Sequence, residues 1–217
     1  METLLLSALA LGAGIVFGAT GFGFAVVLMA FYPLIIGIKS ANVVITLVGL
    51  IMPVYLLYGL RGNVRWGVLA RVFVGAAVGI PVGVRGLVHL DERILTLALG
   101  IFLILYVLYD VLLKPRLRMH VPLSVGYLSG GVAGAFMGAF TAGGPPVVAY
   151  LASLDLEKHE LKASIVAFVL IATIYKVIFL LFHGVVTTEM AVDAAIILPP
   201  TFAGTFIGQL VFSRLSS

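Results

Sequence analysis

The sequence predicts an all-α fold, a polytopic transmembrane helical bundle with two broken helices. Hydrophobic residues make up 62% of the 217 residues and charged residues 10%, against roughly 45–50% and 25% in soluble domains. Several uninterrupted apolar runs reach the roughly 17–25 residues that a membrane-spanning helix needs. Two glycine-rich breaks, at residues 18–23 and 138–146, interrupt this apolar sequence about 120 residues apart. A soluble fold could not cover so much apolar surface with polar side chains.

Charges and turn residues divide the chain into nine expected segments. Two of them are too short to cross a bilayer, and each follows one of the glycine-rich breaks, so we expect half-helices there. The longest polar interruption, Lys114–His120, is only a loop, and the whole chain, residues 1–217, is expected to be one membrane domain. The nine segments are 4–19, 24–37, 43–60, 66–84, 93–112, 123–139, 145–154, 163–182 and 190–211.

Composition also narrows the class of protein. The formal net charge is +4, but the 13 Lys and Arg are scattered between apolar runs and form no basic stripe, so no nucleic-acid partner is expected. There is no cysteine, which excludes disulfides and Cys-ligated metals. The first residues lack a positively charged stretch, so we interpret them as the first membrane pass rather than a cleaved signal. The predicted surroundings are the lipid bilayer, and the predicted location is the cell membrane, with several passes.

The two halves of the chain show a weak internal resemblance. We predict a repeat of about residues 1–113 and a second of about 122–217. Single glycine matches are common in a chain with 25 glycines, so the order of the matches carries the prediction. The matched positions are Gly18 with Gly138, Gly23 with Gly143, Lys39 with Lys162, Gly62 with Gly184, and Gly79-x3-Gly83 with Gly204-x3-Gly208.

The distribution of Lys and Arg predicts the orientation in the membrane. If each half contains an odd number of passes, eight basic residues share one side and three face the other. This bias places the Lys114–His120 loop in the cytoplasm and makes the two repeats inverted, as in many secondary transporters. The larger group is Arg61, Arg65, Lys114, Arg116, Arg118, Lys158, Lys162 and Arg214, and the smaller is Lys39, Arg85 and Arg93.

The two breaks are the candidate substrate-binding site. Non-helical backbone is tolerated at membrane depth only where protein or a water-filled cavity covers its polar groups. A helix that begins there directs free N–H groups and about half a positive charge at whatever precedes it, which suits an anion. The predicted substrate-binding residues are Thr20, Gly21, Gly23, Thr141, Gly143, Gly144, Pro145 and Lys176.

Each of these positions also has a purely structural interpretation. The glycines can be kinks or notches where helices approach closely, and Lys176 can extend its side chain to the nearer membrane surface. Asn42 and Thr46 can cap a helix start or line the pocket. If the site is real, bulky side chains at Gly143 or Gly144 are expected to abolish anion binding without preventing membrane insertion.

The motifs Gly18-Ala-Thr-Gly-Phe-Gly23 and Gly138-Ala-Phe-Thr-Ala-Gly-Gly-Pro-Pro146, with Ala-Ser after Lys162, resemble the TauE/SafE family, also called the 4-toluene sulfonate uptake permeases. The resemblance covers roughly residues 5–212. It implies a membrane permease for small sulfur-containing anions such as sulfite, thiosulfate or an organosulfonate. Members of that family usually carry a final helix for which the second half here has no counterpart. The resemblance leaves the exact substrate, the direction of transport and the coupling ion open.

The sequence therefore predicts a secondary transporter that works by alternating access, with no enzymatic activity, cofactor or metal. The histidines show no metal-binding spacing, and no phosphate-binding loop is present. The alternatives are a permease for another small anion, an accessory or structural membrane subunit, and a membrane-embedded enzyme. A homo-oligomer is compatible with the sequence, which identifies no interface for one.

Overall fold

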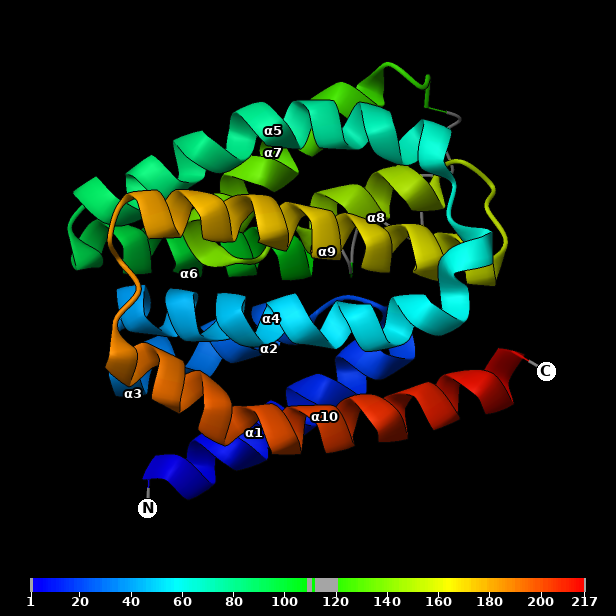
Figure 1. Cartoon of the computed structure of the whole chain (residues 1–217). Coiled ribbons are helices and arrows are strands. Elements are labelled where there is room, and N and C mark those ends of the chain that lie inside the picture. Colours follow the sequence, from blue (N-terminus) through cyan, green and yellow to red (C-terminus); the bar gives the residue numbers. More distant parts are fainter. Residues whose placement is uncertain (1, 109–110, 112–120, 217) are drawn as a thin grey trace.

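In the computed structural model, residues 2–108, 111 and 121–216 are described, and every regular element among them is a helix (Figure 1). The all-α prediction is confirmed. The elements are α1 (Glu2–Thr20), α2 (Phe24–Phe31), α3 (Pro33–Ile36), α4 (Ile38–Leu60), the 3₁₀ turn η1 (Arg61–Asn63), α5 (Trp66–His89), α6 (Glu92–Leu108), α7 (Val125–Phe140), α8 (Gly144–Ala152), α9 (Lys158–Phe182) and α10 (Thr188–Ser216).

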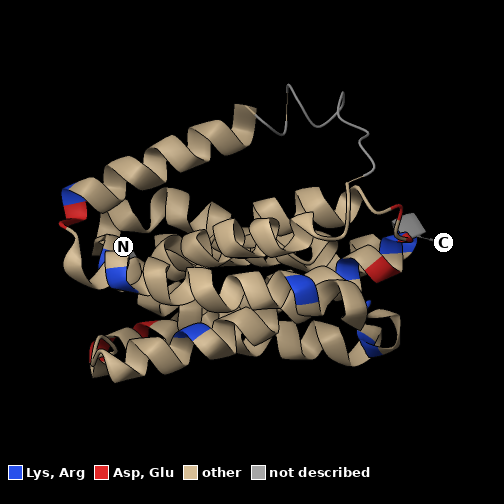
Figure 2. Ribbon diagram, turned by 90° about the horizontal axis from the view of Figure 1, so that it is seen from above, with Lys and Arg blue, Asp and Glu red and all other residues tan. Residues whose placement is uncertain are grey.

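Four stretches in the described part of the chain are long and apolar enough to cross a membrane: Ile38–Asn63, Trp66–His89, Lys158–Phe182 and Thr188–Arg214. Large apolar side chains on their outer faces are exposed, as lipid-facing residues are. Charged residues gather toward the two ends of the bundle, with few in between (Figure 2). This is the charge distribution of a multi-pass membrane protein.

The bundle has two outer helix pairs, α5–α7 and α1–α10, with α4 and α9 between them (Figure 1). Glycines let the backbones of each outer pair approach closely. A Cβ on Gly79 would overlap the carbonyl oxygen of Gly131 in α7, and a Cβ on Gly204 would overlap that of Leu11 in α1. The Gly-x3-Gly pairs found in the sequence are therefore notches for helix packing within the chain.

Both glycine-rich breaks form the turn of a hairpin within the bundle. Helix α2 follows the first break and runs back toward the end where α1 begins, and α8 does the same after α7 (Figure 1). With eight and nine residues, α2 and α8 are the expected half-helices. Pro33 ends α2 and opens the short α3, which divides the predicted segment 24–37.

Corresponding helices of the two halves run in opposite directions, α1 against α7, α4 against α9 and α5 against α10 (Figure 1). Contacts at the helix ends agree with this view. The backbone N–H of Arg65, just after α4, donates to Ser164 near the start of α9. The rings of His89 and His183, at the far ends of α5 and α9, lie 6.5 Å apart. Arg61, Arg65, Lys158, Lys162 and Arg214 thus lie toward one end of the bundle.

Two helices extend past the charged residues that bound the expected segments. Helix α9 begins at Lys158 rather than residue 163, because the N–H of Glu157 donates to the carboxylate of Glu160, which caps the helix. Helix α5 continues past Arg85 to His89. The Lys114–His120 loop lies outside the described residues.

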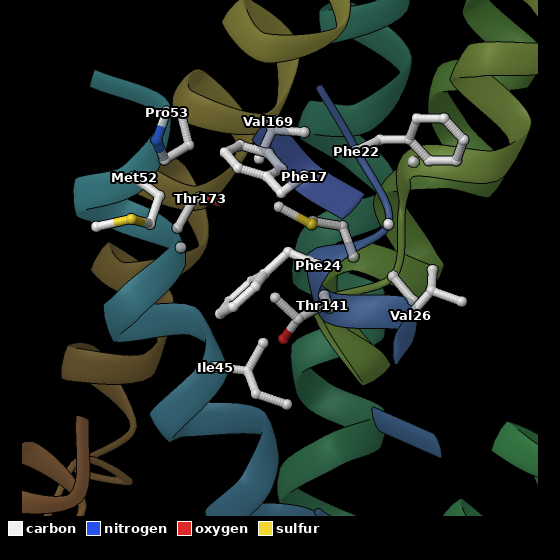
Figure 3. Close-up of a pocket in the computed structure, with 16 residues that line it drawn as sticks. Phe17, Phe22, Phe24, Val26, Ile45, Met52, Pro53, Thr141, Val169 and Thr173 are labelled. Carbon is white, nitrogen blue, oxygen red and sulfur yellow. The ribbon is translucent and has the colours of Figure 1, made fainter. Parts of the chain in front are cut away.

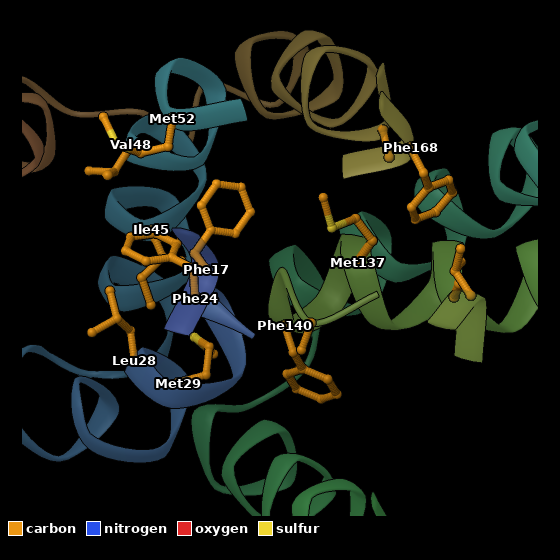
Figure 4. Packing of buried hydrophobic residues seen from close by; sticks show 14 of the residues in the cluster. Phe17, Phe24, Leu28, Met29, Ile45, Val48, Met52, Met137, Phe140 and Phe168 are labelled. Carbon is orange, nitrogen blue, oxygen red and sulfur yellow. The ribbon is translucent and has the colours of Figure 1, made fainter. Parts of the chain in front are cut away.

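The buried core lies where the two hairpins meet α4 and α9. Phe17, Phe24 and Leu28 from the first hairpin face Ile45 and Met52 of α4 (Figure 4). Met137 and Phe140 extend the cluster from α7, and Phe168 extends it from α9. The second break is therefore buried within the bundle, whereas the first is buried at Gly21 and exposed at Thr20.

Candidate functional site: a buried cavity between the two breaks

The first break is built from left-handed glycines. Gly21 and Gly23 have φ values of +83° and +90°, which side chains other than glycine rarely adopt. The hydroxyl of Thr20 lies 2.8 Å from the carbonyl oxygens of both Val16 and Phe22. Thr20 is exposed and bonded within its own turn, and it does not line the cavity described below.

The second break contains a residue in an unusual conformation. Thr141 has φ +57° in the left-handed region although it is not glycine, and its N–H donates to the carbonyl of Met137, which closes α7. A strained backbone of this kind persists where surrounding contacts fix it, and such residues concentrate at functional sites. Helix α8 then begins at Gly144, with Pro145 in its first turn.

The side chain of Thr141 belongs to a buried polar cluster, hereafter the Lys176 cluster, of Asn42, Thr46, Thr141 and Lys176. The ammonium of Lys176 donates to Thr141 Oγ1 at 2.6 Å and to Asn42 Oδ1 at 2.7 Å. The hydroxyls of Thr46 and Thr141 are 3.0 Å apart, and the amide of Asn42 donates to the carbonyl of Ala139 at 2.6 Å. The cluster joins α4, the second break and α9 by side-chain hydrogen bonds.

Lys176 is completely buried, and its hydrogen-bond partners are uncharged. The ion pair found in the described part of the chain, Arg65–Glu160 at 2.8 Å, lies at the end of the bundle. A buried ammonium without a carboxylate is unfavourable, and an incoming anion would relieve that cost. This region of the protein is therefore suited to bind a negatively charged ligand.

A cavity with about 480 Å³ of empty space, part of it open to the surroundings, lies between the two breaks (Figure 3). Apolar and aromatic side chains make most of its wall. The first break and α2 contribute Phe22, Gly23, Phe24, Ala25 and Val26; α1 and α4 contribute Phe17, Ile45, Gly49, Met52 and Pro53; the second break and its flanks contribute Met137, Thr141, Ala142 and Gly144; α9 contributes Val169 and Thr173.

Three of the predicted site residues, Gly23, Thr141 and Gly144, line this cavity. Lys176 lies behind Thr141 and is linked to the cavity through the hydroxyl of that residue. A Cβ on Gly144 would meet the ring of Phe22 at 3.3 Å, so the two breaks touch at this point.

The remaining predicted residues are not part of the lining. A Cβ on Gly21 would meet Val166 and Lys162 of α9, and a Cβ on Gly143 would meet Ala133 and Met137 of α7. Pro145 is buried in the first turn of α8. These positions, with Thr20, shape the breaks without facing the cavity.

Sequence reasoning missed Thr173 as a lining residue and described Asn42 as a capping or pocket residue without finding its bond to Lys176. The spacing of Thr173 and Lys176, three residues apart on α9, was the available signal, because such residues share a helix face. Within the described residues, no group of three or more His, Asp or Glu could hold a metal ion.

The chain matches the sequence profile of the family described as sulfite exporter TauE/SafE over residues 6–217. The chain belongs to the TauE/SafE family. A protein of Cupriavidus necator named "Probable sulfite/organosulfonate exporter TauE" is 27% identical over 209 residues, which cover 92% of this chain and 80% of that protein. No solved structure gives a significant match to the chain. Family membership and the apolar helices together make it a multi-pass membrane protein of a transporter family.

Proposed function

We propose that this TauE/SafE protein is a secondary transporter that carries a small sulfur-containing anion through the cavity between the two breaks by alternating access. The observation that carries the proposal is that one partly open cavity is lined by both breaks, including Thr141, whose hydroxyl accepts a hydrogen bond from the buried Lys176. The relative from C. necator, whose name gives sulfite and organosulfonate as substrates, supports this class of anion.

The two half-helices would contribute unequally to anion binding. The first turn of α2, Phe24–Val26, lines the cavity, and the N–H groups of a first turn have no partner within their helix. In α8, Pro145 and Pro146 occupy the first turn and have no N–H to donate. Helix α2 therefore supplies most of the backbone donors, and the second break supplies Thr141 with the charge of Lys176 behind it.

The arrangement of the helices suits alternating access. The opposite directions of corresponding helices support an inverted repeat, with one unit of about residues 1–113 and another of about 122–217. The glycine-packed pairs α1–α10 and α5–α7 lie on opposite sides of α4 and α9. Rocking of one pair against the other would open the cavity to one membrane face and then to the other, as in other transporters built from inverted repeats.

Transport by purified protein in liposomes tests the proposal. Sulfite, thiosulfate and benzenesulfonate would be compared with phosphate, using empty liposomes as the control. We expect saturable flux of at least one sulfur-containing anion and little flux of phosphate. Flux of phosphate alone would point to a permease for another anion, and no flux for the whole panel would favour an accessory subunit.

A further inference from the structure

Thr173 is a buried threonine of α9 whose hydroxyl has no hydrogen-bond partner. The residue is 1% exposed and lies one turn before Lys176 on the same face of the helix. The other fully buried threonines in the described part of the chain behave differently. The hydroxyls of Thr46, Thr201 and Thr205 each donate to the carbonyl four residues earlier, at 2.7–2.8 Å.

A buried hydroxyl could remove the cost of being unpaired by the same local bond, which any helix offers. Thr173 does not make that bond, and its side chain lines the cavity between the breaks (Figure 3). The hydroxyl oxygen is buried within a residue that lines the cavity, so a ligand that brings an acceptor atom to this part of the wall would satisfy it. Thr173 is thus a donor without an acceptor among the protein groups that the structure describes.

The rest of the wall restricts the kind of ligand. Apart from backbone groups, the polar lining consists of Thr141 and Thr173, while Phe17, Phe22, Phe24 and Met52 face the same space. The faces of aromatic rings carry partial negative charge and disfavour an anion, whereas apolar groups bind well against them. A bare inorganic oxyanion would lose hydration over most of its surface without replacement.

We propose that Thr173 is a substrate-binding residue that donates its hydroxyl to the anionic head of the ligand, and that of the sulfur-containing anions of the proposed function the site favours an organosulfonate over sulfite. The head lies at Thr141 and Thr173, near the charge of Lys176. The substituent lies against the aromatic wall. This inference rests on the proposed anion site. It names a further residue of that site and the kind of sulfur-containing anion that fits its wall.

The test compares binding of sodium benzenesulfonate and sodium sulfite by calorimetry to the full chain in lipid nanodiscs. The variants are Thr173→Val, which keeps the shape and removes the hydroxyl, Thr173→Ser, which keeps the hydroxyl, and Thr201→Val as a control. Thr201 is equally buried on α10 but does not line the cavity, and its hydroxyl bonds to Ile197.

We expect benzenesulfonate to bind the wild type at least about tenfold more tightly than sulfite. Thr173→Val should weaken benzenesulfonate binding by about tenfold or more, because a hydrogen bond to a charged group is lost. Its melting temperature should not fall, because the Thr173 hydroxyl has no hydrogen bond within the protein to lose. Thr173→Ser should bind like the wild type, and Thr201→Val should bind normally.

The outcomes separate the claims. Unchanged benzenesulfonate affinity in Thr173→Val would overturn the role of Thr173 and leave the anion site standing. A drop in melting temperature in Thr173→Val, with equal loss of affinity in Thr201→Val, would show a structural role and overturn it too. Sulfite binding as tightly as benzenesulfonate would overturn the substrate class alone. Binding of neither anion by the wild type would overturn this inference and the proposed site together.

Discussion

At the scale of single residues, the most informative feature is a lysine buried without a carboxylate partner. Lys176 makes two hydrogen bonds to neutral acceptors, Asn42 and Thr141, and both acceptors are themselves buried. Such an arrangement stabilises the fold poorly, because desolvation of the ammonium is only partly offset. An anion bound in the cavity, on the other side of the Thr141 hydroxyl, would compensate for this loss of stability.

Replacing Lys176 with Met should therefore weaken anion binding by about tenfold to a hundredfold while the protein still inserts and folds. The methionine keeps a similar length and removes the charge, and loss of a charged hydrogen-bond partner costs about 1.5–3 kcal/mol. Ligand binding in nanodiscs and the melting temperature should be measured together. Lys39→Met is the matched control, because Lys39 bonds to the carbonyl of Val88 at the end of the bundle. Wild-type affinity in Lys176→Met would contradict this role.

At this scale the sequence draws attention to residue types that are rare in membranes, but it does not show which rotamer a side chain adopts. Lys176 could be predicted because a charge inside an apolar run demands an explanation. Thr173 could not, because the sequence does not show whether a helical threonine bonds to its own backbone or leaves its hydroxyl free. Thr20 was predicted because a hydroxyl in the first break could donate to an anion, but the two breaks differ in conformation, and the hydroxyl of Thr20 bonds within its own turn.

At the scale of elements, Gly143 and Gly144 at the start of α8 have different structural roles. A leucine at Gly144 would extend from the point where the break meets Phe22, a side chain that can move. We expect Gly144→Leu to obstruct the cavity and abolish anion binding with little change in melting temperature. A side chain at Gly143 would instead strike the backbone of Ala133 and the Cβ of Met137. Gly143→Leu should therefore lower the melting temperature and the yield of folded protein.

Thermal melts of both variants, followed by binding measurements on folded protein, distinguish these effects. Equal stability of the two variants would contradict the assignment of Gly143 to helix packing. Full anion affinity in Gly144→Leu would contradict the position of the cavity. The sequence suggested that both glycines would serve the site alike, because it showed their spacing and not the side on which each would carry a Cβ.

The glycine-packed pair α5–α7 allows a second prediction for elements. Gly79→Ala should destabilise the protein by about 1–3 kcal/mol, because the added methyl group would overlap the backbone of Gly131 and Ala135. Gly100→Ala in α6 is the matched control, since a Cβ there meets nothing within 4 Å. It should be neutral or stabilising by about 0.5–1 kcal/mol. Denaturation in detergent measures both changes, and equal stability of the two variants would contradict the close packing.

At the scale of the whole molecule, much of the architecture could be predicted from the sequence. Apolar runs located the helices, and the two short runs became α2 and α8 because a glycine-rich break precedes each of them. What the sequence left open was whether each break continues across the membrane or turns back. That choice depends on packing of α2 against α4 and of α8 against α7 and α9, which are contacts between distant segments.

The side of the membrane on which each end of the bundle lies can be tested with single introduced cysteines, because the chain has no cysteine. Asn63 is exposed at the end of the bundle that carries Arg61, Arg65, Lys158 and Arg214. Asp91 is exposed at the opposite end, between α5 and α6.

Single variants Asn63→Cys and Asp91→Cys should label on opposite sides when intact cells are treated with a membrane-impermeant maleimide. By the excess of positive charge, Asn63→Cys should be protected until the cells are opened, and Asp91→Cys should label from outside. Opening the cells with detergent gives the control for total reactivity. Labelling of both positions from the same side would contradict this topology, because α5, which separates the two positions, would then not cross the membrane. Reversed labelling would keep the fold and invert its orientation, which would place the end of the cavity nearer Lys162 toward the outside.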